Sequence, residues 1–161
     1  MIFFILPILC FAQKCVVDNK DYSFMKRTKD FFKYTGKQGN FDFTMNVCGT
    51  VDNNDNAITA KITPSGNVIS IGKYSTQEPV VDKYGTGFKY TKGESPNGSK
   101  FSGRIYLACE KDKKEDTVSL IEGNFDQNEF AFKISGPSPC KASSAPSIYV
   151  VLAFVLLMIF I

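Results

Sequence analysis

Phe41-Asp-Phe43-Thr-Met45-Asn-Val47-Cys48 decides the fold class, because its apolar and polar residues alternate strictly. Successive side chains of a β-strand point to opposite faces, so a period of two predicts a strand with one buried face. The same alternation recurs at 58–62, 105–109 and 130–134. Clusters rich in Gly, Pro, Asn and Asp separate these segments and predict turns. Together they predict an all-β domain, a sandwich or flattened barrel, with one short helix over 23–32.

The amino-terminal residues 1–12 are apolar and carry no charged side chain. Polar sequence begins directly afterwards at Gln13, and the small residues Cys10 and Ala12 occupy the −3 and −1 positions of a cleavage after Ala12. This pattern predicts a secretory signal peptide.

The carboxy-terminal residues 142–161 are also uncharged and end in an apolar run from Ile148. A helix of that run would reach about 21 Å, short of the ~30 Å hydrocarbon core of a bilayer. Small residues at 142–145 before an apolar tail resemble a GPI-attachment signal, although the spacer is short. A short transmembrane anchor is the alternative, and either one would tether the domain to a membrane.

Residues 13–141 hold every charged side chain and form the expected luminal or extracellular domain. The formal net charge of +3 is spread along the chain, which argues against a nucleic-acid partner. The chain has no histidine, so His-based catalysis and His-ligated zinc are excluded. We expect no metal, no cofactor and no enzymatic activity. A hydrolase with paired carboxylates is a minor alternative, since the acidic residues cluster in turns.

Four cysteines remain once Cys10 leaves with the signal peptide: Cys15, Cys48, Cys109 and Cys140. An even number in an oxidising compartment predicts two disulfides, with three possible connectivities. Asn97-Gly98-Ser99 is an N-glycosylation sequon inside a turn cluster, so Asn97 is a candidate glycan site. An unmodified Asn-Gly hairpin turn is the alternative.

The order of these motifs resembles the mannose-6-phosphate receptor homology (MRH) domain. The resemblance rests on Cys15, Tyr22-Ser-Phe24, the segment 41–48, Tyr90-Thr-Lys-Gly93, Arg104-Ile-Tyr-Leu-Ala-Cys109, 130–134 and Pro139-Cys140. It implies a flattened β-barrel of two antiparallel sheets, of the kind found in lectins and sorting receptors of the secretory pathway. It also implies the pairings Cys15–Cys48 and Cys109–Cys140. The cysteines of the family's third disulfide would fall near Pro96 and Asn128, where this chain has none.

Sugar-binding members of that family hold mannose with a Gln, an Arg, a Glu and a Tyr. Counted from the matching cysteines, the Gln position falls near Lys61, and the Arg position falls near Lys100-Phe101, with Arg104 displaced toward Cys109. The Glu position lies about two residues from Glu122, and the Tyr position falls on Phe130. The candidate ligand contacts are therefore Lys61, Lys100, Arg104 and Glu122. The incomplete quartet makes the fold resemblance stronger than the mannose-binding one.

The function that the resemblance implies is a membrane-tethered luminal binding domain of the secretory or endolysosomal pathway. It would act as a divergent lectin or as a sorting receptor for glycoproteins, with a glycoprotein or glycan as its partner. The alternative is a GPI-anchored adhesive or coat protein of the cell surface that binds no sugar.

Overall fold

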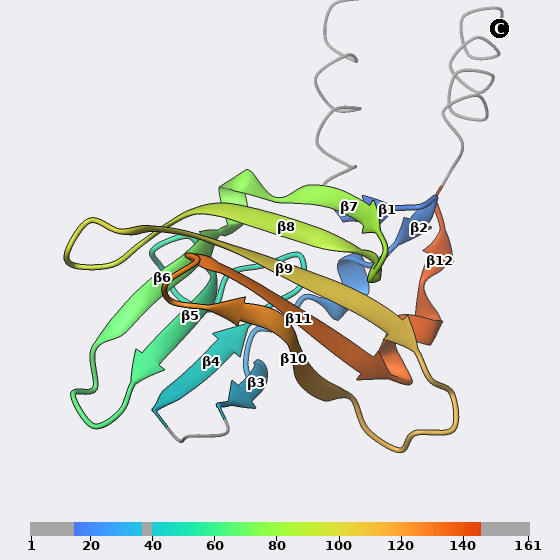
Figure 1. Ribbon diagram of the computed structural model, residues 1–161. Coiled ribbons are helices and arrows are strands. Elements are labelled where there is room, and N and C mark those ends of the chain that lie inside the picture. Colours follow the sequence, from blue (N-terminus) through green and yellow to red (C-terminus); the bar gives the residue numbers. More distant parts are fainter. Residues whose placement is uncertain (1–14, 37–39, 146–161) are drawn as a thin grey trace, which may run out of the picture.

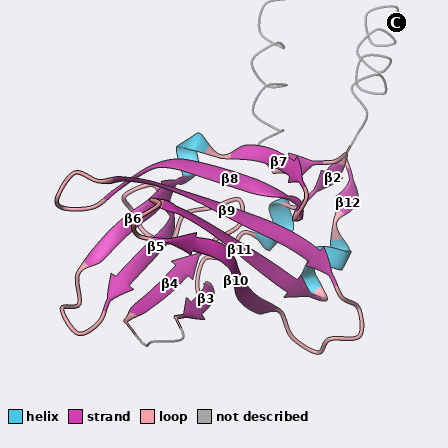
Figure 2. Cartoon of the chain, in the orientation of Figure 1, coloured by secondary structure: helices cyan, strands magenta, loops and turns pink. Residues whose placement is uncertain are grey.

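The computed structural model describes residues 15–36 and 40–145, and these residues form an all-β domain (Figures 1 and 2). The all-β class and the flattened barrel predicted from the sequence are confirmed. The strands are β1 (Val16–Val17), β2 (Lys20–Asp21), β3 (Phe32–Thr35), β4 (Phe41–Met45), β5 (Asn56–Ile62), β6 (Val68–Lys73), β7 (Glu78–Asp82), β8 (Gly85–Glu94), β9 (Lys100–Cys109), β10 (Thr117–Asn124), β11 (Glu129–Gly136) and β12 (Ser143–Ser144). Three 3-10 turns accompany them: η1 (Ser23–Met25), η2 (Tyr74–Thr76) and η3 (Ser138–Lys141).

Two layers of strands enclose the core. One layer is the antiparallel series β3-β4-β5-β6, and the other has the order β7-β8-β9-β11-β10. Strand β8 belongs mainly to the second layer but also pairs with β6 at Gly72 and Lys92, which joins the layers along one side. Strands β10 and β3 approach each other on the other side, so the barrel is nearly closed.

The pairing of β9 with β11 is parallel, whereas the sequence resemblance implied purely antiparallel sheets. Strand β10 runs back along the outer side of β11, so that β11 is inserted between β9 and β10. A parallel neighbour therefore arises at the centre of an otherwise antiparallel layer.

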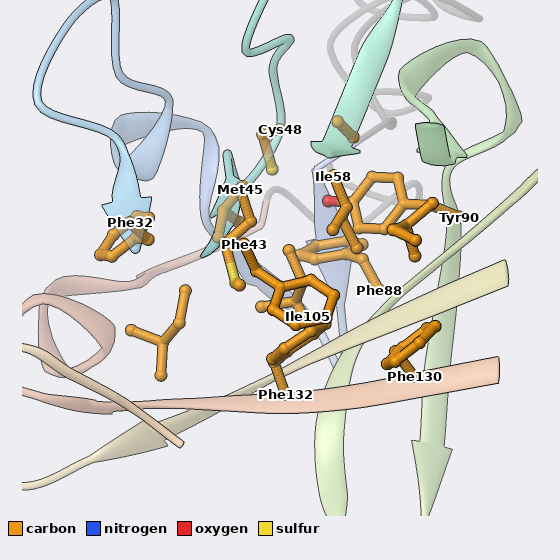
Figure 3. Packing of buried hydrophobic residues seen from close by; sticks show 14 of the residues in the cluster. Phe32, Phe43, Met45, Cys48, Ile58, Phe88, Tyr90, Ile105, Phe130 and Phe132 are labelled. Carbon is orange, nitrogen blue, oxygen red and sulfur yellow. The ribbon is translucent and has the colours of Figure 1, made fainter. Parts of the chain in front are cut away.

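Alternating side chains of both layers meet in a single aromatic-rich core (Figure 3). Phe43 of β4 lies with its ring centroid 5.2 Å from that of Phe130 and 5.0 Å from that of Phe132, both on β11. The layers approach closely at Gly103, where an added Cβ would lie 2.6 Å from Ile58 Cδ1. A side chain at Gly103 would push the two sheets apart.

The helix predicted over 23–32 is wrong, because only Ser23–Met25 forms a 3-10 turn and Phe32 begins β3. The buried side chain of Asn46 holds the backbone between them. Its Oδ1 accepts from the Arg27 backbone N–H at 2.9 Å, and its Nδ2 donates to the Arg27 carbonyl at 2.8 Å. These contacts satisfy the peptide groups that would otherwise pair within a helix.

Both predicted disulfides, Cys15–Cys48 and Cys109–Cys140, are confirmed. Strands β1, β2 and β12 form a small sheet, and the Ala145 N–H donates to the Asn19 carbonyl at 2.9 Å. The two ends of the described chain therefore lie side by side at one end of the barrel (Figure 1).

Residues 142–145, at the start of the expected carboxy-terminal segment, fold as part of the domain, since Ala142 packs against the core and β12 pairs with β2. The expected signal peptide at 1–12 and the rest of the anchor segment, 146–161, lie outside the described residues. Within the described ranges, no helix has the length and apolarity needed to cross a membrane.

Candidate binding surfaces

Arg104 and Glu122, two of the four candidate ligand contacts, touch each other. The Arg104 Nη2 donates to Glu122 Oε1 at 2.9 Å. Strand β11 lies between β9 and β10, and its residue Ala131 pairs with Arg104 on one side and with Glu122 on the other. Because the alanine side chain is small, the guanidinium can reach across β11 to the carboxylate. Their neighbours Ile105 and Phe130 point into the core, so this pair lies on the outer face of the layer rather than inside the barrel.

A wider network surrounds this pair and is here called the outer charge cluster, consisting of Asp82, Tyr84, Arg104, Tyr106, Glu122 and Glu129. The hydroxyl of Tyr106 donates to Asp82 Oδ2 at 2.6 Å, and that of Tyr84 donates to Glu122 Oε2 at 2.5 Å. The guanidinium of Arg104 also lies 3.7 Å from Asp82 Oδ2 and 3.6 Å from Glu129 Oε2. Arg104 Nη1 donates to the Tyr106 hydroxyl at 3.4 Å. Its hydrogen bonds and ion pairs thus form a network that ties together the strands β7, β9, β10 and β11.

The pKa values follow from these contacts. The hydrogen bond from Tyr106 lowers the pKa of Asp82, and the charges of Arg104 and Lys83 act in the same direction. Burial, together with the hydrogen bond to Asp82, raises the pKa of the Tyr106 hydroxyl to about 12. At neutral pH the cluster therefore has an ionised Asp82 that accepts from a protonated Tyr106.

A β-bulge places Glu122 on the outer face. Val118 and Leu120 of β10 pack against the core, and a strict period of two would place Glu122 on the same side. The register shifts between Leu120 and Glu122, so that Leu120 pairs with Phe132 and Glu122 pairs with Ala131. The extra residue reverses the side to which Glu122 points.

The other two candidate contacts lie elsewhere. Lys61 is exposed on β5, between the inward residues Ala60 and Ile62, and so lies on the outer face of the opposite layer. Lys100 opens β9 and forms an exposed ion pair with Glu94, with Nζ 2.8 Å from Oε1. The structure therefore brings Arg104 and Glu122 together and leaves Lys61 and Lys100 apart from them.

Aromatic rings occupy the interior positions that correspond to the sugar-binding quartet. Phe130, at the expected Tyr position, is 3% exposed and lies 4.9 Å from Phe125 between ring centroids. Phe101, beside the expected Arg position, is 6% exposed and packs edge-on against Phe125 at 5.8 Å. This part of the interior thus contains rings where a pocket for sugar hydroxyls needs hydrogen-bonding groups.

A concavity of about 470 Å³ opens at the end of the barrel beyond these rings. We call it the aromatic concavity, lined by Phe41, Ile62, Ile69, Phe101 and Phe125, with a rim of Ser95, Pro96, Asn97, Ser99 and Asn128. The rim comes from the β8–β9 and β10–β11 loops. These loops lie at the opposite end of the barrel from β12 and the two described chain ends (Figure 1). This rim includes Pro96 and Asn128, the two positions near which the resemblance to the MRH family places the cysteines of a third disulfide.

No motif in the sequence predicts the aromatic concavity. Its signal was the position of Phe41 and Phe125 beside polar turn segments, at the start of β4 and just after β10. Aromatic residues at the ends of strands often cover the end of a hydrophobic core, so this pattern alone does not distinguish core packing from a binding surface. Among the described residues, no cluster of acidic and cysteine side chains is arranged to hold a metal ion.

No protein-family model and no curated protein matches the chain. Solved structures do match. Chicken IGF2R domain 11 has a TM-score of 0.56 and 18% identity, over 72% of this chain and 80% of that one. Domain 11 of the echidna IGF2R receptor has a TM-score of 0.56 and 16% identity, over 80% of this chain and 87% of that one.

The MRH domain of Yos9, solved in complex with alpha3,alpha6-Man5, is more distant, with a TM-score of 0.44 and 13% identity over 68% of this chain and 76% of that one. The two domain 11 structures share the architecture with this chain over most of their length. The chain therefore has the MRH-type β-barrel fold seen in domain 11 of the IGF2R receptor.

Proposed function

We propose that this chain is a membrane-tethered binding domain of the secretory pathway that recognises a protein ligand through the aromatic concavity. The observation that carries the proposal is the apolar lining of the concavity, with three phenylalanines at its floor. Of these, Phe41 and Phe125 are partly exposed, and such aromatic side chains in a hollow are typical of the centre of protein–protein interfaces. Two disulfides support an oxidising compartment, in which secreted and luminal domains fold.

The interior chemistry favours a protein ligand over a mannose. Recognition of a sugar requires donors and acceptors fixed opposite its hydroxyls, and an unmatched buried hydroxyl costs about 1–3 kcal/mol. Phe101 and Phe130 supply neither donors nor acceptors, and Arg104 is bound to carboxylates on the outer face. An apolar side chain of a partner would meet no such penalty.

The position of the chain ends supports the same reading. Cys15 and Ala145 lie at one end of the barrel, and the aromatic concavity lies at the other. A membrane anchor in 146–161 would therefore hold the small sheet near the bilayer and present the concavity away from it. The fold shared with domain 11 does not choose between a sugar and a protein ligand, so the choice rests on the residues of the concavity.

Site-specific photo-crosslinking tests the proposal in cells that pass the full chain through their secretory pathway. Benzoylphenylalanine replaces Phe125, at the floor of the concavity, or Val81, which is 65% exposed on β7, as a matched control. We expect a protein adduct of defined mass from position 125 and none from position 81. Equal adducts from both positions, or none from position 125 both in the chain with Asn97 and in the chain that also carries Asn97→Asp, would refute a ligand at the concavity.

The lectin reading is tested with the purified full chain on an array of mannose-type glycans. The proposal predicts no binding. Binding that disappears in Glu122→Gln but survives Phe125→Ala would assign a sugar site to the candidate residues and contradict the protein-ligand reading. Release of the protein from cells by a phosphatidylinositol-specific phospholipase would identify a GPI anchor, and retention would identify a transmembrane one.

A further inference from the structure

The sequon Asn97-Gly98-Ser99 lies on the rim of the aromatic concavity. Asn97 is exposed, and both Asn97 and Ser99 line the hollow together with Phe41, Phe101 and Phe125. The sequence pattern had placed the sequon only in a turn, and the tertiary structure places that turn over the apolar floor.

The backbone of the β8–β9 loop holds Asn97 in a defined position. The Ser95 N–H donates to the Ser99 carbonyl at 3.0 Å, and the Gly98 N–H donates to the Ser95 carbonyl at 2.9 Å. Asn97 Oδ1 accepts from the Ser99 N–H at 3.2 Å and from the Ser95 hydroxyl. Asn97 Nδ2, by contrast, makes no hydrogen bond with any described residue, so a substituent on this atom costs the loop no contact.

We propose that Asn97 carries an N-linked glycan that covers the aromatic concavity and limits access to it. In the modification, Asn97 Nδ2 forms a bond to the anomeric carbon of an oligosaccharide supplied as its lipid-linked diphosphate. The bond from that carbon to the diphosphate oxygen breaks, the diphosphate leaves with the bonding electrons, and the amide loses one proton. The first sugar then stands at the rim, where its apolar ring face can pack on Phe41 or Phe125.

This inference rests on the proposed secretory location and on the concavity as the binding surface. It adds that the glycosylated chain and the bare chain differ in ligand access. A bulky glycan at one edge of a binding hollow competes with any partner that must reach the floor.

The modification is tested on the full chain made in secretory cells. Treatment with a peptide N-glycosidase should shift the mobility of the wild-type chain, but not that of Asn97→Asp or Ser99→Ala. Asn128→Asp, which alters an asparagine of the same rim that lies outside a sequon, should still shift. A wild-type chain that does not shift would overturn the inference.

The cover is tested by hydroxyl-radical footprinting of the same full-length proteins with mass-spectrometric readout. Phe41 and Phe125 should be oxidised several-fold more slowly in the glycosylated chain than in Asn97→Asp, which reproduces the residue left by the glycosidase. Ser99→Ala should match Asn97→Asp. Phe24, 45% exposed in η1 and away from the concavity, should react equally in all forms.

Equal oxidation of Phe41 and Phe125 in the glycosylated and bare proteins would refute the proposal that the glycan covers the aromatic concavity. Failure of the proposed function would look different, because the crosslink from position 125 would then be missing in the bare Asn97→Asp protein as well.

Discussion

The two faces of the layer built from β8, β9 and β11 differ in chemistry although they alternate along the same strands. On β9, Phe101, Gly103 and Ile105 face the core, whereas Arg104 and Tyr106 face outward. The inner face is apolar and aromatic, and the outer face carries the outer charge cluster. The charged groups that a sugar ligand would need thus lie on the outer face, whereas the inner face, which leads to the aromatic concavity, offers rings.

The difference between the two faces arises within single strands of the barrel. Each β-strand residue belongs to one face only, so ligand chemistry inside the barrel depends on which half of the alternation is polar. In this chain the inner half is apolar up to the rim.

The largest effect should come from opening a cavity on the inner face. Phe132→Ala removes a ring that is 0% exposed and packs on Phe43, which should lower the free energy of unfolding by about 3–5 kcal/mol. Urea unfolding followed by tyrosine fluorescence measures this, since the chain has no tryptophan. Val81→Ala, on the exposed edge strand of the same layer, is the matched control and should change the value by less than about 0.5 kcal/mol. A comparable loss in both variants would contradict the comparison.

Removal of the disulfide that fastens the ends of β9 and β11 should have the next largest effect. Cys109 ends β9, and Cys140 follows β11 in η3, with a sequence separation of 31. The double variant Cys109→Ser/Cys140→Ser should lose about 3–4 kcal/mol, because the unfolded chain regains the freedom of that loop. Wild-type protein unfolded after reduction provides an independent check, and it should have lost at least as much stability as the double variant.

A smaller effect is expected on the outer face. Arg104→Ala breaks contacts to Glu122, Asp82 and Glu129, and with its side chain 22% exposed we expect a loss of about 1–2 kcal/mol that shrinks in high salt. Lys89 lies opposite Arg104 on β8, and Lys89→Ala should be nearly neutral. A salt-independent loss, or a loss as large as that of Phe132→Ala, would mean that Arg104 has a core role instead.

The last effect is confined to alkaline pH and distinguishes two of the buried tyrosines, Tyr106 and Tyr90. The pKa of Tyr106 is raised from 10.0 to about 12, so its contribution to stability is complete below the unfolded pKa of about 10 and is lost as the pH rises toward 12. Tyr106→Phe should therefore show a shallower loss of stability than the wild type in denaturant titrations between about pH 10 and 12.

Tyr90 provides the inner-face counterpart. It is fully buried, and its hydroxyl donates to Gln77 Oε1 at 2.9 Å. Burial raises the pKa of Tyr90 further than that of Tyr106, so in the native protein the absorbance change of Tyr106 ionisation should precede that of Tyr90. The reverse order, established with Tyr90→Phe and Tyr106→Phe, would contradict the assignment of faces.

Much of the fold followed from local patterns. The alternation in 41–48 and 130–134 identified strands β4 and β11, and the resemblance supplied both cysteine pairings. The helix expected over 23–32 failed because a residue far along the chain, Asn46, takes its backbone hydrogen bonds. A contact between distant segments has no signature in the local period.

The candidate site was less predictable. Counting from cysteines selected Arg104 and Glu122, and the two do meet, but the bulge after Leu120 that turns Glu122 outward is invisible in the period-two pattern. Lys61 and Lys100 were selected by the same counting and lie on other surfaces.

The sequence by itself determined the class of the domain, four of its strands (β4, β5, β9 and β11) and the presence of a sequon. Each of these depends on neighbouring residues and, for the strands, on the two-residue period of an extended chain. Only the tertiary structure decided which side chains share a surface. The aromatic concavity is lined by Phe41 of β4, Phe101 of β9 and Phe125 of the β10–β11 loop, and Asn97 of the β8–β9 loop lies on its rim. Strand order and register bring these residues together, and both depend on pairing between segments that are far apart in the chain.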